Sequence, residues 1–113
     1  MEKRNVVKTD EIPGTYKQFI KKFPALGAAH ERIAEAVESY APLDAKTREL
    51  IKIGLSVGGG FESATRSHVR RAVHNGATEA EIEQTVLLAM NTCGFPRTVM
   101  AWRWVREQIE RGI

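Results

Sequence analysis

Residues 43–72 read LDAKTRELIKIGLSVGGGFESATRSHVRRA, and they carry the clearest helical pattern of the chain. Asp44 precedes a run of good helix formers, which is the usual place of an N-cap. The small Gly54 inside that helix predicts close approach by a neighbouring helix. Gly58-Gly59-Gly60 then interrupts the pattern, and a second helix is predicted from about residue 61 to the stop at Asn75-Gly76. The stretch therefore predicts two helices joined by a glycine turn. The apolar face of the first helix is formed by Leu50, Ile53 and Val57.

The same helical periodicity continues on both sides of this stretch. Further helices are predicted at about residues 16–23, 26–37, 78–94 and 99–111. The third of these opens with a T-x-x-E capping box formed by Thr78 and Glu81. Alternating patterns typical of strands are nearly absent. The sequence therefore predicts an all-α fold of about six helices, with mostly antiparallel neighbours.

Length and composition fit one ordinary globular domain. The chain has 113 residues, of which 42% are hydrophobic and 27% charged. Residues 1–13 are predicted to be a flexible lead-in that ends at the turn signal Pro13-Gly14, and residues 14–113 a single helical domain. The net charge of +3 is spread among acidic residues, without a basic run that contains aromatics. This pattern argues against a nucleic-acid partner.

The sequence also predicts where the protein works and what it does not bind. Its charged start lacks the apolar run of a signal peptide, and its longest apolar run is far below the ~20 residues of a membrane helix. We expect a cytoplasmic, soluble protein without a membrane partner. Cys93 is the single cysteine, so an internal disulfide or CxxC pair is excluded. The three histidines lack metal-ligand spacing, so we expect no metal site and no cofactor.

Four short motifs occur in a characteristic order. They are LD-x-K-T-R-E-L-I from Leu43, R-S-H-V-R-x-A from Arg66, G-A-T-x-x-E-I from Gly76 and G-F-P from Gly94. Together they resemble the carboxymuconolactone decarboxylase / alkylhydroperoxidase D-like family over about residues 42–105. The resemblance implies an alkylhydroperoxidase D-like helical bundle that assembles into a homo-oligomer.

The resemblance also implies which residues could carry chemistry. In the peroxidase branch of the family, a glutamate and a histidine relay protons to a CxxC pair; Glu49 and His68 match the first two. The cysteine positions fall on Phe61 and Ala64, neither of which forms a thiolate, so thiol peroxidase activity is not expected. The decarboxylase branch does without the cysteine pair and uses acid–base chemistry, but Ser63 stands where that branch has a histidine.

We therefore predict a site in which His68 is the acid/base and Glu49 its partner. The predicted substrate-binding residues are Phe61, Ser63, Ala64 and Thr65. The substrate would be a small organic acid or lactone, and the reaction a non-redox lyase or isomerase step.

Structural explanations stay open for the same residues. His68 could be a half-buried histidine that only holds Glu49, and Glu49 could pair with Lys46 or Lys52 on its own helix. Phe61 could wall off a pocket or fill the core.

Two other classes of function remain. The chain could be a non-catalytic ligand-binding or assembly module with a degenerate site, or it could act through Cys93 and an external thiol. A buried, inert Cys93 is the favoured interpretation of that residue. Trp102 and Trp104 lie about 200° apart on a helix. One is predicted to face the core and the other a second subunit.

Overall fold

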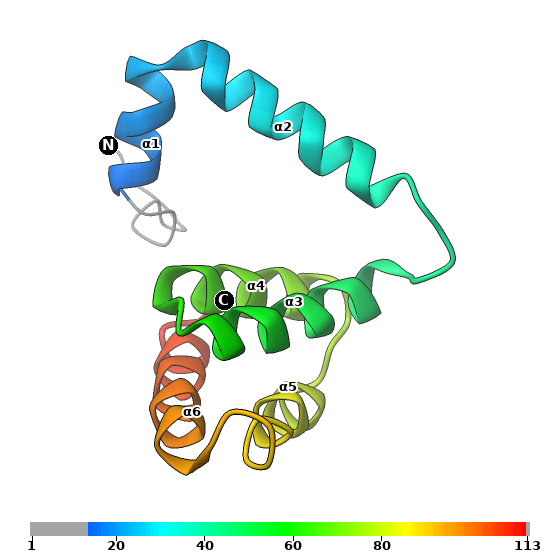
Figure 1. The fold of residues 1–113 in the computed structure, drawn as a ribbon, viewed down its shortest axis with the longest axis vertical. Coiled ribbons are helices and arrows are strands. Elements are labelled where there is room, and N and C mark those ends of the chain that lie inside the picture. Colours follow the sequence, from blue (N-terminus) through cyan, green and yellow to red (C-terminus); the bar gives the residue numbers. More distant parts are fainter. Residues whose placement is uncertain (1–13, 113) are drawn as a thin grey trace. The chain divides into compact units, whose positions relative to one another are not determined.

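The computed structural model describes residues 14–112, and in that range it contains six α-helices and no strand (Figure 1). The all-α prediction is confirmed; the predicted lead-in of residues 1–13 lies outside the described residues. The chain divides at Pro42 into two compact units, the first with α1 and α2 and the second with α3 to α6. The helices are α1 (Gly14–Lys22), α2 (Pro24–Glu38), α3 (Ala45–Gly59), α4 (Glu62–His74), α5 (Glu79–Leu87) and α6 (Phe95–Glu110).

The first unit is a pair of packed helices. Pro24 occupies the first position of α2, where its missing N–H costs no hydrogen bond. Gly27 lets α1 approach α2, because a Cβ there would lie 3.0 Å from the Ile20 side chain. The rings of Phe19 and Phe23 lie 5.0 Å apart. Neither helix has a buried residue.

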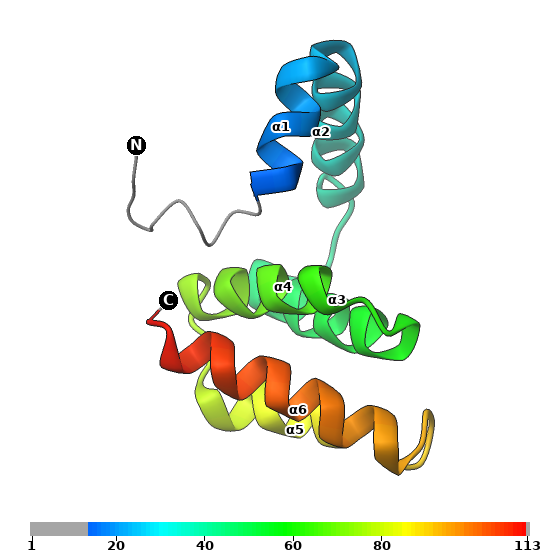
Figure 2. The same ribbon diagram turned by 90° about the vertical axis from the view of Figure 1, so that its left-hand side faces the viewer.

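The second unit has two layers of two helices. The α3 and α4 helices lie side by side in one layer, and α5 and α6 form the other (Figures 1 and 2). Apolar side chains from all four helices meet between the layers. The fully buried ones are Ile53, Val57, Val69, Ala72, Ile82, Val86, Ala101 and Val105.

Both predicted helix caps are confirmed. The Asp44 carboxylate accepts the Thr47 N–H at 2.8 Å, and this hydrogen bond lowers the pKa of Asp44. Thr78 and Glu81 form the complete capping box of α5. Glu81 also accepts from Lys46 Nζ at 3.0 Å, and the Thr78 backbone N–H and Lys46 together lower the pKa of Glu81. The box therefore also ties α5 to α3.

The predicted length of the fifth helix is wrong, because α5 ends at Leu87 rather than near Gly94. The Ala89 carbonyl accepts the N–H groups of Thr92, Cys93 and Gly94, which closes a compact turn in place of further helix. Gly94 follows with a φ of 104°, a conformation suited to glycine, and α6 begins at the next residue.

Two arginines hold α6 against the other layer. Arg66 on α4 donates to Glu107 at 2.8 Å and to the Trp104 carbonyl at 3.3 Å, and its hydrogen bond lowers the pKa of Glu107. Arg97 donates to the Gly58 carbonyl at 2.7 Å, at the end of α3. On the same helix, Trp104 packs in the apolar core and is 4% exposed, whereas Trp102 is 40% exposed. One tryptophan thus faces the core, as predicted.

The turn between α3 and α4 depends on its glycines. Gly60 caps α3 with a φ of 74°. The Phe61 ring lies directly over Gly59, so that a Cβ at Gly59 would overlap ring atoms. The close approach predicted at Gly54 is wrong, because a Cβ there would meet only the Thr85 methyl, at an ordinary 3.9 Å.

Gln108 is an exception in the core. Its side chain is fully buried on α6. Neither its amide nitrogen nor its amide oxygen has a hydrogen-bond partner within residues 14–112. A buried polar group without a partner costs about 1–3 kcal/mol relative to its hydrated state. Gln108 is therefore expected to reduce the stability of the second unit.

Replacement of Gln108 by methionine should stabilise the protein. The side chains are similar in size, both residues favour helix, and the change removes the unsatisfied groups. We expect Gln108→Met to raise the free energy of unfolding by about 1–3 kcal/mol in urea titrations at fixed protein concentration. Gln84→Met, on the exposed side of α5, is the control and should change stability little. A destabilised Gln108→Met would mean that the amide has a partner in solution.

Two glycines of α3 should respond in opposite ways to alanine. Gly54→Ala should raise the free energy of unfolding by about 0.5–1 kcal/mol, because alanine favours helix and the space is free. Gly59→Ala should lower it, because the methyl group displaces the Phe61 ring. Adding Phe61→Ala to Gly59→Ala should recover the loss. Equal stabilisation by both alanines in thermal or urea unfolding would show that the ring does not rest on Gly59.

Candidate active site

The structure brings Glu49 and His68 together across the packed pair α3 and α4. Glu49 lies in the first half of α3, and His68 lies in the middle of α4. Glu49 Oε1 is 2.7 Å from His68 Nδ1, which is the length of a strong, charge-assisted hydrogen bond. The two residues are separated by 19 positions in the chain. Their contact is therefore produced by the glycine turn and the packing of the two helices.

This contact defines the protonation pattern of the imidazole. With Glu49 ionised, its carboxylate only accepts hydrogen bonds, and Nδ1 then donates the hydrogen that it shares with Glu49. In the neutral ring Nε2 is then a proton acceptor, and in the protonated ring it is a donor. The side chain of Glu49 is 7% exposed and that of His68 is 18% exposed. The pair is largely shielded from water, and the histidine is its more accessible member.

Lys52 is a third member of this cluster. Its Nζ lies 3.8 Å from Glu49 Oε2, one helical turn along α3. Lys46, the other proposed partner of Glu49, instead pairs with Glu81 on α5. Sequence spacing identified Lys52 as a possible ion-pair partner but not as part of a site. The i,i+3 spacing between Glu49 and Lys52 could have indicated it, because the family resemblance had already marked Glu49 as a candidate site residue.

The four predicted substrate-binding residues are not equally placed. Ala64 is half-buried and lies one turn before His68 on α4. Ser63 is exposed on the first turn of that helix. Thr65 is completely buried, and its hydroxyl donates to the Phe61 carbonyl at 2.7 Å. Phe61 is 61% exposed with its ring over Gly59, so it does not fill the core.

Cys93 is exposed, and the prediction of a buried thiol is wrong. It belongs to the turn that closes on the Ala89 carbonyl, and its Sγ lies near Gly58, at the end of α3. The short α5 explains the error, because residues expected to continue that helix form a surface turn instead. Among the described residues, no group of three or more His, Cys, Asp or Glu side chains could hold a metal ion.

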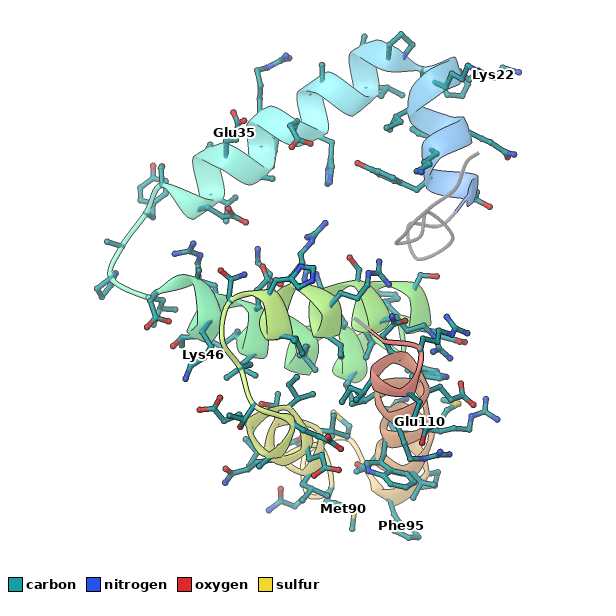
Figure 3. All side chains as sticks on the ribbon, turned by 180° about the vertical axis from the view of Figure 1, so that it is seen from behind. Lys22, Glu35, Lys46, Met90, Phe95 and Glu110 are labelled. Atoms are coloured by element: carbon teal, nitrogen blue, oxygen red, sulfur yellow. The ribbon has the colours of Figure 1, made fainter. Side chains whose placement is uncertain are left out.

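A separate apolar groove of about 670 Å³ lies along α6 between Phe95 and Arg106. None of the predicted site residues lines it. Figure 3 shows Phe95 and Met90 on the side of the α5–α6 layer that faces away from α3 and α4. The groove has no side chain that exchanges protons near neutral pH, so it is not a candidate for acid–base chemistry. Its lining residues are Phe95, Pro96, Val99, Met100, Trp102, Arg103 and Arg106.

No helix within residues 14–112 combines the length and the apolar character that crossing a membrane requires.

Comparison with known proteins identifies the chain's family. The model of the carboxymuconolactone decarboxylase family matches residues 24–107. Nitrosuccinic acid decarboxylase from the fungus Metarhizium robertsii is 34% identical over 74 residues, which cover 62% of this chain and 52% of that protein. The chain thus spans about half the length of this curated relative.

A solved structure shares the fold. It is the apo form of a carboxymuconolactone decarboxylase family protein from Legionella pneumophila, with a TM-score of 0.78 and 27% identity. The match covers 90% of this chain and 91% of that one. The family match over most of the chain agrees with the arrangement of helices described above. The chain belongs to the carboxymuconolactone decarboxylase family.

Proposed function

We propose that this chain catalyses a non-redox lyase step, a decarboxylation, on a small organic acid. The observation that carries the proposal is the 2.7 Å contact between Glu49 and His68 in a shielded position. An imidazole oriented by a carboxylate is a common general acid and base near neutral pH. The similarity to a nitrosuccinic acid decarboxylase supports a decarboxylation over the isomerase and lactone alternatives.

The proposed reaction needs a proton donor more than a nucleophile. The bond between the carboxylate and its neighbouring carbon breaks, carbon dioxide leaves, and the electron pair stays on that carbon. An electron-withdrawing substituent, such as a nitro or carbonyl group, must accommodate the pair. Protonated His68 then donates the Nε2 proton to the carbon, while Glu49 holds Nδ1 and stabilises the imidazolium. Solvent returns the proton to His68 for the next cycle.

We do not propose a dithiol peroxidase cycle for this chain. That cycle requires two thiols, and this chain has only Cys93, on an exposed turn. Phe61 and Ala64 occupy the positions that the cysteines hold in the peroxidase branch. The substitutions remove the redox groups, while the proton-transferring pair remains.

His68 should be essential if this proposal is correct. We expect His68→Ala to lower kcat for carbon dioxide release from nitrosuccinate by at least about 10²-fold, because general acid–base groups contribute factors of that size. Glu49→Gln should cause a smaller loss, since it leaves the imidazole in place. His74→Ala is the matched control, because His74 is exposed on the same helix. A parent rate retained in His68→Ala would refute the mechanism.

A second candidate function is assembly, which the apolar groove on α6 favours. We propose that this groove packs against a second copy of the chain. Phe95, Val99, Met100 and Trp102 are each between 40% and 63% exposed, and Leu87 and Leu88 add to the apolar surface of the same layer. Covering the exposed parts of these six side chains would form the apolar centre of an interface, which in a standard complex buries about 800 Å² per partner. A soluble monomer rarely exposes such a patch.

A charge placed in the groove should disrupt the proposed homo-oligomer. We expect the parent protein to elute as an oligomer in size-exclusion chromatography with light scattering, and Met100→Glu to shift its mass toward the monomer. Gln84→Glu, on the exposed side of α5, adds the same charge outside the groove and should leave the mass unchanged. A monomeric parent, or a Met100→Glu variant of unchanged mass, would refute this assembly surface.

A further inference from the structure

The Glu49 carboxylate links two nitrogen groups at one place in the α3–α4 layer. Its Oε1 lies 2.7 Å from the His68 imidazole, and its Oε2 lies 3.8 Å from the Lys52 ammonium. Lys52 and His68 therefore contact different oxygens of the same carboxylate. The side chain of Lys52 is 27% exposed, so the ammonium lies at the solvent-accessible edge of the cluster.

Lys52 changes the charge that an incoming acid would meet. Without it, the shielded Glu49 carboxylate would give the cluster a negative charge whenever His68 is neutral, and an organic anion would be repelled. With the Lys52 ammonium present, the Glu49–Lys52 pair is neutral. Protonation of His68 then makes the cluster positive, which favours an anion at the moment when the imidazole can donate its proton.

The geometry of the ion pair lets Lys52 interact with more than Glu49. A separation of 3.8 Å is longer than the 2.7–3.2 Å of a hydrogen bond, so the attraction is mainly coulombic. An ammonium carries three donors and can serve several acceptors at once. Lys46 differs, because it forms a 3.0 Å hydrogen bond to Glu81 between α3 and α5. The two lysines of α3 thus have different partners and different surroundings.

The chemistry of decarboxylation limits which carboxylate Lys52 can hold. A tight ion pair with the departing carboxylate would stabilise the ground state and oppose the loss of carbon dioxide. A carboxylate that stays on the product can be held throughout the reaction. Nitrosuccinic acid, the acid in the name of the Metarhizium relative, carries two carboxyl groups.

We propose that Lys52 binds the retained carboxylate of a small dicarboxylic acid and thereby places the departing carboxylate at His68. This inference rests on the proposed function for the catalytic step but not for the binding step. The substrate class is a short dicarboxylate with an electron-withdrawing group on the carbon that loses carbon dioxide. Lys52 acts by binding and orientation, and His68 supplies the proton.

Binding can be tested without turnover by using succinate, which lacks the activating substituent. Calorimetric titration of the full chain should show that succinate binds more tightly than propionate, which has one carboxylate. Lys52→Met should weaken succinate binding at least about tenfold, the usual effect of losing a charged hydrogen bond, and should abolish its advantage over propionate. Lys52→Arg should retain most of the affinity, and Lys46→Met, which also removes one positive charge from α3, should retain all of it.

The outcomes separate this inference from the proposed function. A parent protein that does not bind succinate, or that binds propionate equally well, would overturn it. So would a folded Lys52→Met or Lys52→Gln variant with parent affinity for succinate. In turnover of nitrosuccinate, Lys52→Met should raise KM more than it lowers kcat. Lys52-dependent binding together with an unchanged rate in His68→Ala would support the dicarboxylate site and refute only the catalytic mechanism.

Discussion

The burial of one carboxylate constrains the second unit more than any other feature. Glu49 is 7% exposed between two packed helices, where an isolated charge would be strongly unfavourable. His68 and Lys52 compensate for this burial, each through a different oxygen. Because His68 belongs to α4, the compensation is possible only if α3 and α4 pack in one register. The charge cluster and the helix pair therefore depend on each other.

The glycine turn makes that register possible. Gly60 ends α3 in a left-handed conformation, and the flat surface of Gly59 receives the Phe61 ring. Phe61 therefore has a structural role at the end of α3. Thr65 also stabilises this turn, because its buried hydroxyl donates a hydrogen bond to the Phe61 carbonyl. The first turn of α4 is fixed by packing and hydrogen bonding. This turn sets the direction of α4, the helix that carries His68.

Features that depend on residues close together in the chain were predictable from the sequence. The Asp44 cap and the Thr78–Glu81 box were predictable because each involves residues three positions apart. The end of α5 was not, since three N–H groups converge on the Ala89 carbonyl in a turn that periodicity does not reveal. The exposure of Cys93 was missed for the same reason. The pairing of Glu49 with His68 came from family resemblance, because 19 intervening residues give no local signal.

The position of Lys52 shows why a matched motif does not by itself describe a site. The motif singled out Glu49 and His68, but the charge around this pair also depends on a neighbouring lysine, and sequence spacing alone does not show which one. Lys46 and Lys52 are both three residues from Glu49, yet Glu81 on α5 takes Lys46 and leaves Lys52 beside the carboxylate. The capping box holds the Glu81 carboxylate at the start of α5, where it pairs with Lys46. The charge next to Glu49 therefore follows from tertiary contacts of α3 that the spacing of residues along one helix does not reveal.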